Sequence, residues 1–208
     1  MPTSIVLRRV TIAAFATAAL AVPATPAAAA ALPCVAGITC SDAPAAKPAA
    51  CPGADLQPTG GNLATIRRAT LCLVNRQRAK HHLHKLHGNG ALAGVATRYA
   101  QRMVAESFFD HVSPGGGTFV QRIERSSYLR PEDGYSLGEN LAWGTGVLGS
   151  PRRIVRAWMH SPGHRANILN GSFRDAGIGI AVGVPVAGGG LGATYANEFG
   201  TRRRAIIH

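Results

Sequence analysis

The sequence predicts an α+β fold, in which several helices pack against an antiparallel sheet. Helical periodicity dominates the chain from Leu63 to about residue 169, and strand-type patterns are concentrated near its C-terminal end. The last of these patterns alternate apolar and small residues over Gly177–Val184 and Leu191–Phe199. The glycine run Gly188–Gly190 separates them, as is typical of a hairpin with antiparallel strands.

Four helices are expected before this hairpin. Leu63–Lys80 combines apolar residues at helical spacing with a basic outer face, and Ala91–Ser107 repeats the apolar spacing. Thr118 is a suitable N-cap for a third helix that extends to about Tyr128. Pro151 opens a fourth helix, because proline is favoured in the first helical turn.

The first thirty residues have the organisation of a secretory signal peptide. Arg8 and Arg9 form a basic start, an apolar run covers Val10–Val22, and small residues at A-x-A spacing follow. The apolar run is shorter than a membrane-spanning helix requires, so we expect no transmembrane segment. We therefore expect residues 1–30 to be removed and the protein to be secreted, with the cleaved bond and the export route left open.

Two further segments follow the signal peptide. Residues 31–60 are rich in proline, alanine and glycine and contain few large apolar side chains, so we expect a tail or linker there. Residues 61–208 form the expected domain. The chain carries a net charge of +12, and removal of Arg8 and Arg9 leaves +10 because residues 1–30 contain no acid. Such a protein favours anionic wall polymers or lipid head groups. Specific nucleic-acid binding is not expected, because the arginines are scattered and no reader motif is present.

The four cysteines are expected to form disulfides. They are Cys34, Cys40, Cys51 and Cys72, and an even number in an exported chain is typical of disulfide bonding. Of the three possible connectivities we favour Cys51–Cys72, which would tie the extended lead-in to the first helix. Cys34–Cys40 would then close a small loop in the tail. A metal site is the alternative, but the spacings do not match paired zinc ligands.

Three residues are candidates for a functional site: His111, Glu139 and His164. Each lies outside the helical patterns, at a break bounded by glycine or proline, and His164 belongs to the corner Ser161–Leu169. Residues 135–144 around Glu139 predict a strand or an irregular segment. Two imidazoles and a carboxylate can hold a zinc-like divalent cation, with the histidines as metal ligands, or can act as acid and base. A structural role for each residue is the alternative.

A second histidine cluster lies between the first two helices. Four of the seven residues in His81–His87 are histidines, and such a segment can bind a metal ion. No cysteine or carboxylate accompanies them locally, so adventitious chelation by an exposed loop is the interpretation we favour.

Four motifs in the second half of the chain carry a resemblance to a known family. They are FFDHVSPG at 108–115, GENLAWG at 138–144, AWMHSPGHRANIL at 157–169 and GIGIAVG at 177–183. In this order they resemble the bacterial branch of the CAP superfamily, also called SCP or cysteine-rich secretory, antigen 5 and pathogenesis-related 1 domains, over roughly residues 62–200. The resemblance implies secretion and an α-β-α sandwich with a central antiparallel sheet. It also implies a cleft lined by His111, Glu139 and His164 that in relatives can bind a divalent cation.

The chain departs from the animal branch of this family at two places. There, the resemblance implies a tetrad of two histidines and two acids, with one acid following a tryptophan on the fourth helix. Ser161 stands at that spacing after Trp158, and residues 193–199 lack the second histidine, which His164 would have to replace. Glu198 could supply the second acid, but strand alternation alone does not say which face it occupies.

These observations favour a secreted, monomeric binding module with a metal-capable cleft. The expected partner is a lipid, an anionic cell-wall polymer or another protein. A metal- or His/Glu-dependent hydrolase of the protease type, acting outside the cell, is the alternative. A purely structural or basic surface-binding protein is a third possibility. The sequence contains no serine or cysteine nucleophile motif and decides neither whether the protein is an enzyme nor which ligand it takes.

Overall fold

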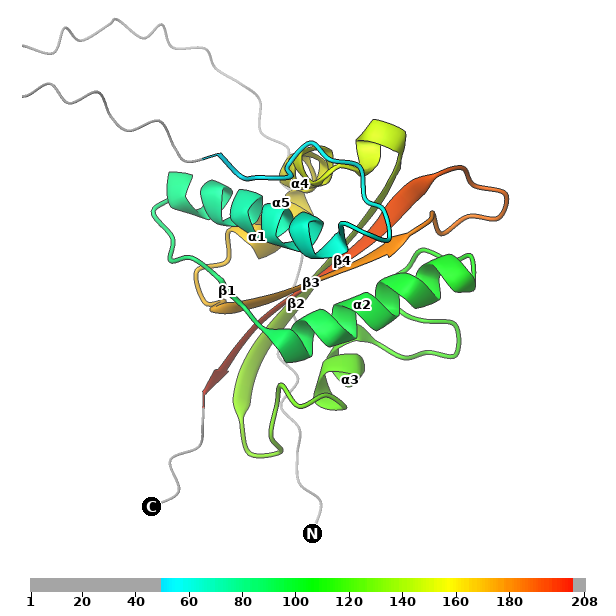
Figure 1. The fold of residues 1–208 in the computed structure, drawn as a ribbon. Helices are drawn as coiled ribbons and strands as arrows, with labels where there is room; N and C mark the ends of the chain where they lie inside the picture. Colours follow the sequence, from blue (N-terminus) through cyan, green and yellow to red (C-terminus); the bar gives the residue numbers. More distant parts are fainter. Residues whose placement is uncertain (1–49, 204–208) are drawn as a thin grey trace, which may run out of the picture. The chain divides into compact units, whose positions relative to one another are not determined.

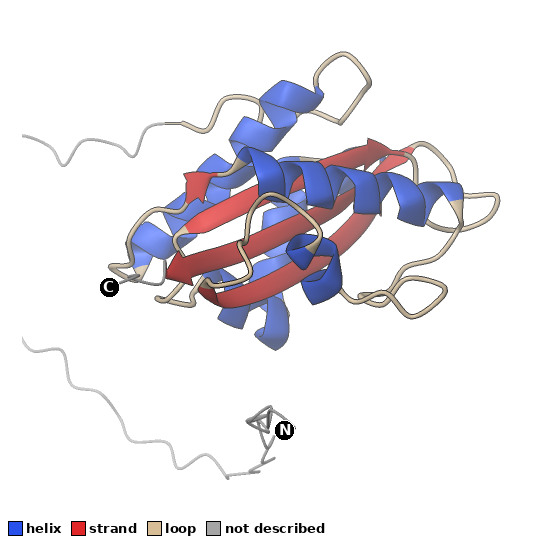
Figure 2. Cartoon of the chain, turned by 90° about the horizontal axis from the view of Figure 1, so that it is seen from below, coloured by secondary structure: helices blue, strands red, loops and turns tan. Residues whose placement is uncertain are grey.

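The computed structural model describes residues 50–203, which fold into three layers. The helices are α1 (Leu63–Lys80), α2 (Gly90–Ala105), α3 (Phe119–Glu124), α4 (Pro151–His160) and α5 (Pro162–Ile168). The strands are β1 (His87–Gly88), β2 (Gly134–Thr145), β3 (Asp175–Val182) and β4 (Gly192–Arg203), and a short 3-10 helix, η1, covers Gly146–Gly149. Helices α1, α4 and α5 cover one face of the sheet, and α2 and α3 cover the other (Figures 1 and 2). The expected α-β-α sandwich is confirmed.

Two of the expectations concern residues outside the described range. The signal peptide at 1–30 and the Cys34–Cys40 pair both fall there. Within residues 50–203, no helix combines the length and the apolar character needed to cross a membrane.

The strands occur in the order β1-β3-β4-β2, and the pairs β3–β4 and β4–β2 are antiparallel. The expected hairpin at the C-terminal end is therefore confirmed as β3 and β4. One edge differs from the expectation, because β1 pairs with β3 in parallel. That strand contains only two residues, too few for an alternating pattern to reveal it. At the opposite edge, β2 pairs along its whole length with β4, and Glu139 lies directly opposite Glu198.

Strand alternation divides the apolar side chains between the two faces of the sheet. Ile178, Ile180 and Tyr195 belong to the core under α1, α4 and α5. Gly177 and Gly179 face α2, where an added Cβ would overlap the backbone of that helix. Helix α2 therefore lies directly against β3, which draws this layer close to the sheet and positions the loop that follows the helix.

The corner after α4 differs from the expected turn. Ser161 has extended backbone, and Pro162 then begins the short helix α5, so His164 is a helical residue. The expectation that all three candidate residues are non-helical was wrong for this one. A proline at the first helical position is already held in helical conformation and needs no N–H partner there. This accounts for a new helix one residue after the break.

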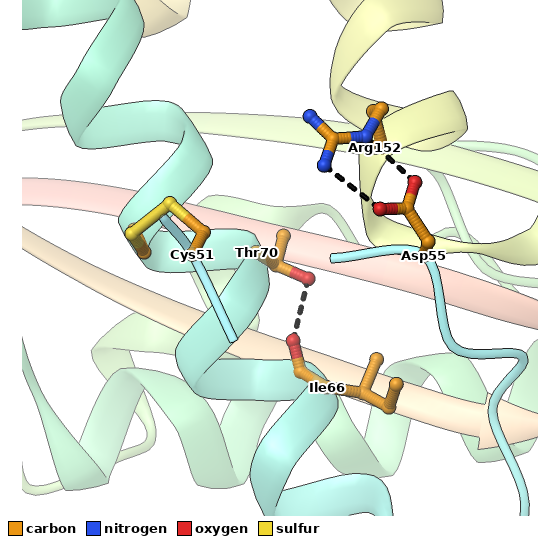
Figure 3. Close-up of a disulfide and its surroundings, with 6 residues drawn as sticks. Cys51, Asp55, Ile66, Thr70 and Arg152 are labelled. Atoms are coloured by element: carbon orange, nitrogen blue, oxygen red, sulfur yellow. Dashed lines mark hydrogen bonds and ion pairs between the residues drawn. A yellow bond between two sulfur atoms is a disulfide. The ribbon is translucent and has the colours of Figure 1, made fainter. Parts of the chain in front are cut away.

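The lead-in to α1 is part of the packed structure. Cys51 and Cys72 form the expected disulfide, with Cα atoms 5.8 Å apart, and Cys51 is buried (Figure 3). Ala54 is also buried, and its carbonyl accepts a hydrogen bond from the backbone N–H of Arg152. The Arg152 side chain makes a two-pronged ion pair with Asp55 (Figure 3). Residues we expected in a tail or linker thus join α1 to the start of α4.

Candidate functional site

Glu139 is the centre of the candidate site. Strand β2 turns it toward the α2 and α3 face of the sheet, and only 4% of the residue is exposed. Its Oε1 lies 2.7 Å from Nδ1 of His111, and its Oε2 accepts a hydrogen bond of 2.7 Å from Nη2 of Arg122. Each carboxylate oxygen therefore has its own cationic or polar partner, as a buried acidic side chain requires.

His111 lies in the loop that follows α2, at the rim of the site. The Tyr99 hydroxyl donates to the carbonyl of Asp110 at 2.6 Å, and Arg122 donates to the carbonyl of His111 itself at 3.2 Å. These bonds fix the loop, while half of the His111 side chain stays exposed. The hydrogen bond to Glu139 raises the pKa of His111 above its usual value, against an opposing effect of burial.

Arg122, from α3, is the site residue that sequence reasoning missed. Its guanidinium lies 3.3 Å from the centre of the Tyr99 ring, a cation–π contact, and donates to the carbonyl of Gly117 at 3.0 Å. Together with the bonds to His111 and Glu139, these contacts join the loop, α2 and β2. No local motif distinguishes Arg122 from the other arginines of the chain. The one available signal was Thr118, the expected N-cap, which forms a capping box that sets where α3 begins.

Glu198 occupies the same face of the sheet as Glu139, directly across from it on β4. The residue is completely buried, and no N–H or hydroxyl donor among the described residues reaches either of its carboxyl oxygens. Burial, reinforced by the negative charge of Glu139 and by a side-chain hydrogen bond to that residue, raises the pKa of Glu198 well above its ordinary value. The second acid is therefore present, in a setting that disfavours its charged form.

His164 approaches β2 from the opposite helical layer. Its backbone carbonyl accepts a hydrogen bond of 3.0 Å from Nδ2 of Asn140, the neighbour of Glu139. Asn167, one turn later in α5, donates to the Glu139 carbonyl at 3.1 Å and to Oδ1 of Asn140 at 2.9 Å. Because β2 is an edge strand, residues from both layers can meet beside it. Burial, and then the positive charge of His111, lower the pKa of His164 below its usual value.

The three predicted site residues are thus arranged around one strand edge, with different degrees of contact. His111 and Glu139 bond directly, whereas His164 is tied to β2 through its backbone and is coupled to His111 by charge. Among residues 50–203, no three His, Cys, Asp or Glu side chains are grouped so that they could hold a metal ion. The metal assignment to His111 and His164 stays a prediction, and so does the merely adventitious chelation expected of the His81–His87 loop.

Comparisons with known proteins agree with this architecture. YkwD, an uncharacterized protein of Bacillus subtilis, is 35% identical over 118 residues, which are 57% of this chain and 43% of YkwD. The chain thus spans less than half the length of this curated relative. An outer surface protein from Borrelia burgdorferi has the same fold, with a TM-score of 0.55 at 23% identity, over 70% of this chain and 96% of that one.

A second solved structure has a closer sequence. It is an extracellular SCP-domain protein from Bacillus anthracis, 26% identical with a TM-score of 0.52, over 68% of this chain and 43% of that one. Residues 71–185, more than half of this chain, match the family described as "CAP: Cysteine-rich secretory protein family". With this match and the sandwich fold in agreement, the chain belongs to the cysteine-rich secretory protein (CAP) family.

Proposed function

We propose that this protein is a secreted binding module whose ligand docks at the edge of β2, beside His111, Glu139 and His164. The observation that carries the proposal is the complete engagement of the Glu139 carboxylate by His111 and Arg122. A carboxylate neutralised on both oxygens is a poor general base, because a base needs a free lone pair facing its substrate. Glu198 supplies no replacement, because it is completely buried and its side chain is closed off from a ligand in solvent.

The chemistry at the rim suits a ligand that carries negative charge or hydrogen-bond acceptors. His111 offers a half-exposed ring whose raised pKa favours the charged, donating form. The net charge of +12, which becomes +10 once residues 1–30 with Arg8 and Arg9 are removed, would attract anionic wall polymers, lipid head groups or an acidic protein surface. These are the partner classes we propose. Extracellular action follows from the signal-peptide pattern in residues 1–30.

A divalent cation is proposed as an accessory ligand of the same site. Glu139 holds Nδ1 of His111, so Nε2 of that ring is the nitrogen left for a metal. Carboxylates commonly orient metal-binding histidines in this way. His164 would be the second ligand, and water or the bound partner would complete the coordination. A site with two protein ligands would be weaker than a closed structural zinc site, which has about four.

The binding proposal is tested by recovering the mature protein from its host and identifying co-purifying lipids, glycans and proteins by mass spectrometry. The ligand so found should bind His111→Ala at least tenfold more weakly than the wild type. His160→Ala is the matched control, because His160 is an exposed histidine on α4. Equal binding by wild type and His111→Ala would contradict the proposed docking edge.

The cation proposal is tested by calorimetric titration with zinc. We expect binding that weakens in His111→Ala and in His164→Ala and fades below about pH 6.5, where imidazoles protonate. Replacement of the exposed His81 and His82 by alanine is the control for the histidine loop. Loss of binding in that control alone would place the ion on the loop instead.

A hydrolase remains the second candidate, because the two histidines have oppositely displaced pKa values. The pKa of His111 is raised and that of His164 is lowered. Two groups with pKa values displaced in opposite directions can divide the roles of acid and base. The test is incubation with a peptide library and mass-spectrometric detection of cleavage. Turnover lost in both His111→Ala and His164→Ala, and kept in His160→Ala, would favour the hydrolase over the binding module.

A further inference from the structure

A pocket of about 230 Å³ lies between α2 and α3, beside Arg122. It is lined by Val95, Arg98, Tyr99, Arg102, Arg122 and Arg125. Figure 2 shows the face of the sheet on which these two helices lie. The lining therefore contains four guanidinium groups and no acid, over a floor formed by a buried valine and a buried tyrosine ring.

The four arginines differ in how far their charge is already compensated. Arg122 is paired with Glu139, and Arg102 is paired with Glu106 at 2.7 Å. Arg98 and Arg125 make no side-chain hydrogen bond and no ion pair within residues 50–203, and both are exposed at the mouth of the pocket. Two positive charges at the mouth thus lack a partner. Like charges brought together without a counter-charge repel one another, so this arrangement favours an anionic ligand.

We propose that this pocket binds a phosphate monoester, with the phosphate held by Arg98 and Arg125 and the esterified group lying in the pocket beside Val95 and the stacked Arg122 and Tyr99. A phosphate monoester is close to doubly negative at neutral pH, which matches two uncompensated guanidiniums. Guanidinium forks pair with phosphate oxygens in a bidentate manner. A volume of about 230 Å³ is smaller than most drug-sized pockets, which start near ~300 Å³. The pocket therefore suits a small ester or the exposed head of a larger one.

This site is independent of the docking edge proposed above. Its two anchoring arginines come from α2 and the end of α3 and do not contact His111, Glu139 or His164. The two proposals meet only at Arg122, whose side chain lines the pocket and bonds Glu139. Failure of one experiment therefore leaves the other interpretable, provided that Arg122 itself is left unchanged.

The test is calorimetric titration of the mature protein with phenyl phosphate at low salt. We expect binding in the wild type and a loss of at least tenfold in affinity when Arg98→Gln and Arg125→Gln are combined. Arg153→Gln with Arg156→Gln is the matched control, since it removes the same charge from exposed arginines on α4. Affinity should be kept in that control. Benzoate, which carries a carboxylate on the same ring, tests the preference for phosphate. Inorganic phosphate, which lacks the ring, tests whether the apolar part of the pocket contributes.

Several outcomes would overturn the proposal. They are absence of phenyl phosphate binding, an equal loss in the α4 control, and benzoate binding as tight as phenyl phosphate. Inorganic phosphate binding as tightly as the ester would remove the role of Val95 and Tyr99. Vesicles of phosphatidylcholine with and without phosphatidic acid distinguish the source of the ester. Vesicle binding that depends on phosphatidic acid and on Arg98 and Arg125 supports a lipid head group, and phenyl phosphate binding alone supports a soluble ester.

Discussion

Glu139 sets the protonation of the site, because it is the main cause of the raised pKa of His111. In Glu139→Gln we expect that pKa to fall toward the unperturbed value of about 6.5. Imidazole NMR titration measures it directly, with exposed His160 as the internal reference. A pKa for His111 that does not change would contradict the hydrogen bond to Glu139 as the cause of the raised value.

The same shift has a defined consequence for stability. A histidine whose folded-state pKa is raised contributes stability that is fully present below the unfolded pKa, near about 6.5, and is lost as pH rises through the folded value. His164, with a lowered pKa, acts in the opposite sense, because its contribution is lost as pH falls below the unfolded value. The two contributions are lost in different pH ranges, that of His111 above about pH 6.5 and that of His164 below it, so the individual titrations are more informative than melting curves.

Glu198 offers a clearer test of stability, because it is completely buried and its raised pKa has one dominant cause, burial beside the carboxylate of Glu139. Its raised pKa means that stability is highest below the unfolded pKa of a glutamate. It declines, by up to about 1.4 kcal/mol per pH unit, as pH rises toward the folded value. Glu198→Gln removes this dependence and leaves the shape unchanged. We expect the variant and the wild type to have the same melting temperature near pH 4, and the variant to have the higher melting temperature at pH 7.5. If Glu198→Gln melts at a lower temperature than the wild type at pH 7.5, the ionised form of Glu198 stabilises the fold and the prediction is wrong.

The site could be predicted from the sequence only in part, and the missing part consists of tertiary contacts. His111 and Glu139 were found because glycine- and proline-bounded motifs mark them. Glu198 was a candidate, but the sequence did not say on which face of the sheet its side chain lies. The register of β2 and β4 answers this, because it places Glu198 directly opposite Glu139. Arg122 was missed, because its importance comes from bonds to residues of the loop and of β2.

At the scale of elements, the long periodic segments were predicted well and the short ones were not. Helix α1 has the predicted ends, and α2 and α4 were placed within about two residues. The two-residue strand β1 and the seven-residue helix α5 are shorter than the windows in which periodicity can be recognised. Their formation depends on packing, which for α5 includes the hydrogen bonds of Asn140 and Asn167.

The contact between α2 and β3 is the element-scale feature most sensitive to a single methyl group. A Cβ at Gly179 would overlap the backbone of Ala96 and Thr97, which cannot move aside as a side chain can. We expect Gly179→Ala to lower the free energy of unfolding by about 1–3 kcal/mol or more. Urea denaturation measures this. Gly163→Ala in α5 is the control, since nothing lies within 4 Å of an added Cβ there. Equal stability of the two variants would contradict the close approach of α2.

At the scale of the whole molecule, the two helical layers are held to one sheet by different means. On the α2 and α3 face, small residues allow close backbone packing, and Arg122 joins the loop to the sheet. On the other face, an apolar core that includes Trp158, Tyr195 and Phe199 fills the space beneath α1, α4 and α5. The lead-in from Cys51 closes over this second layer and is bonded to both α1 and α4. The candidate site lies at the edge strand between the two layers, so its geometry depends on both.

The Cys51–Cys72 bond should therefore stabilise the whole domain and not only the lead-in. It closes a loop with a sequence separation of 21 residues, and removal of such a bridge costs about 2–5 kcal/mol in small exported domains. The nearby Asp55–Arg152 pair cannot replace it, because both side chains are mostly exposed and exposed ion pairs contribute about 0–1 kcal/mol. We expect Cys51→Ala with Cys72→Ala to lower the melting temperature by several degrees, measured by circular dichroism. The matched pair Cys34→Ala with Cys40→Ala should melt with the wild type, because we expect that pair to close a loop in the tail. If the first variant keeps the wild-type melting temperature, the lead-in is held by packing alone. If the second variant loses as much as the first, the tail also stabilises the domain.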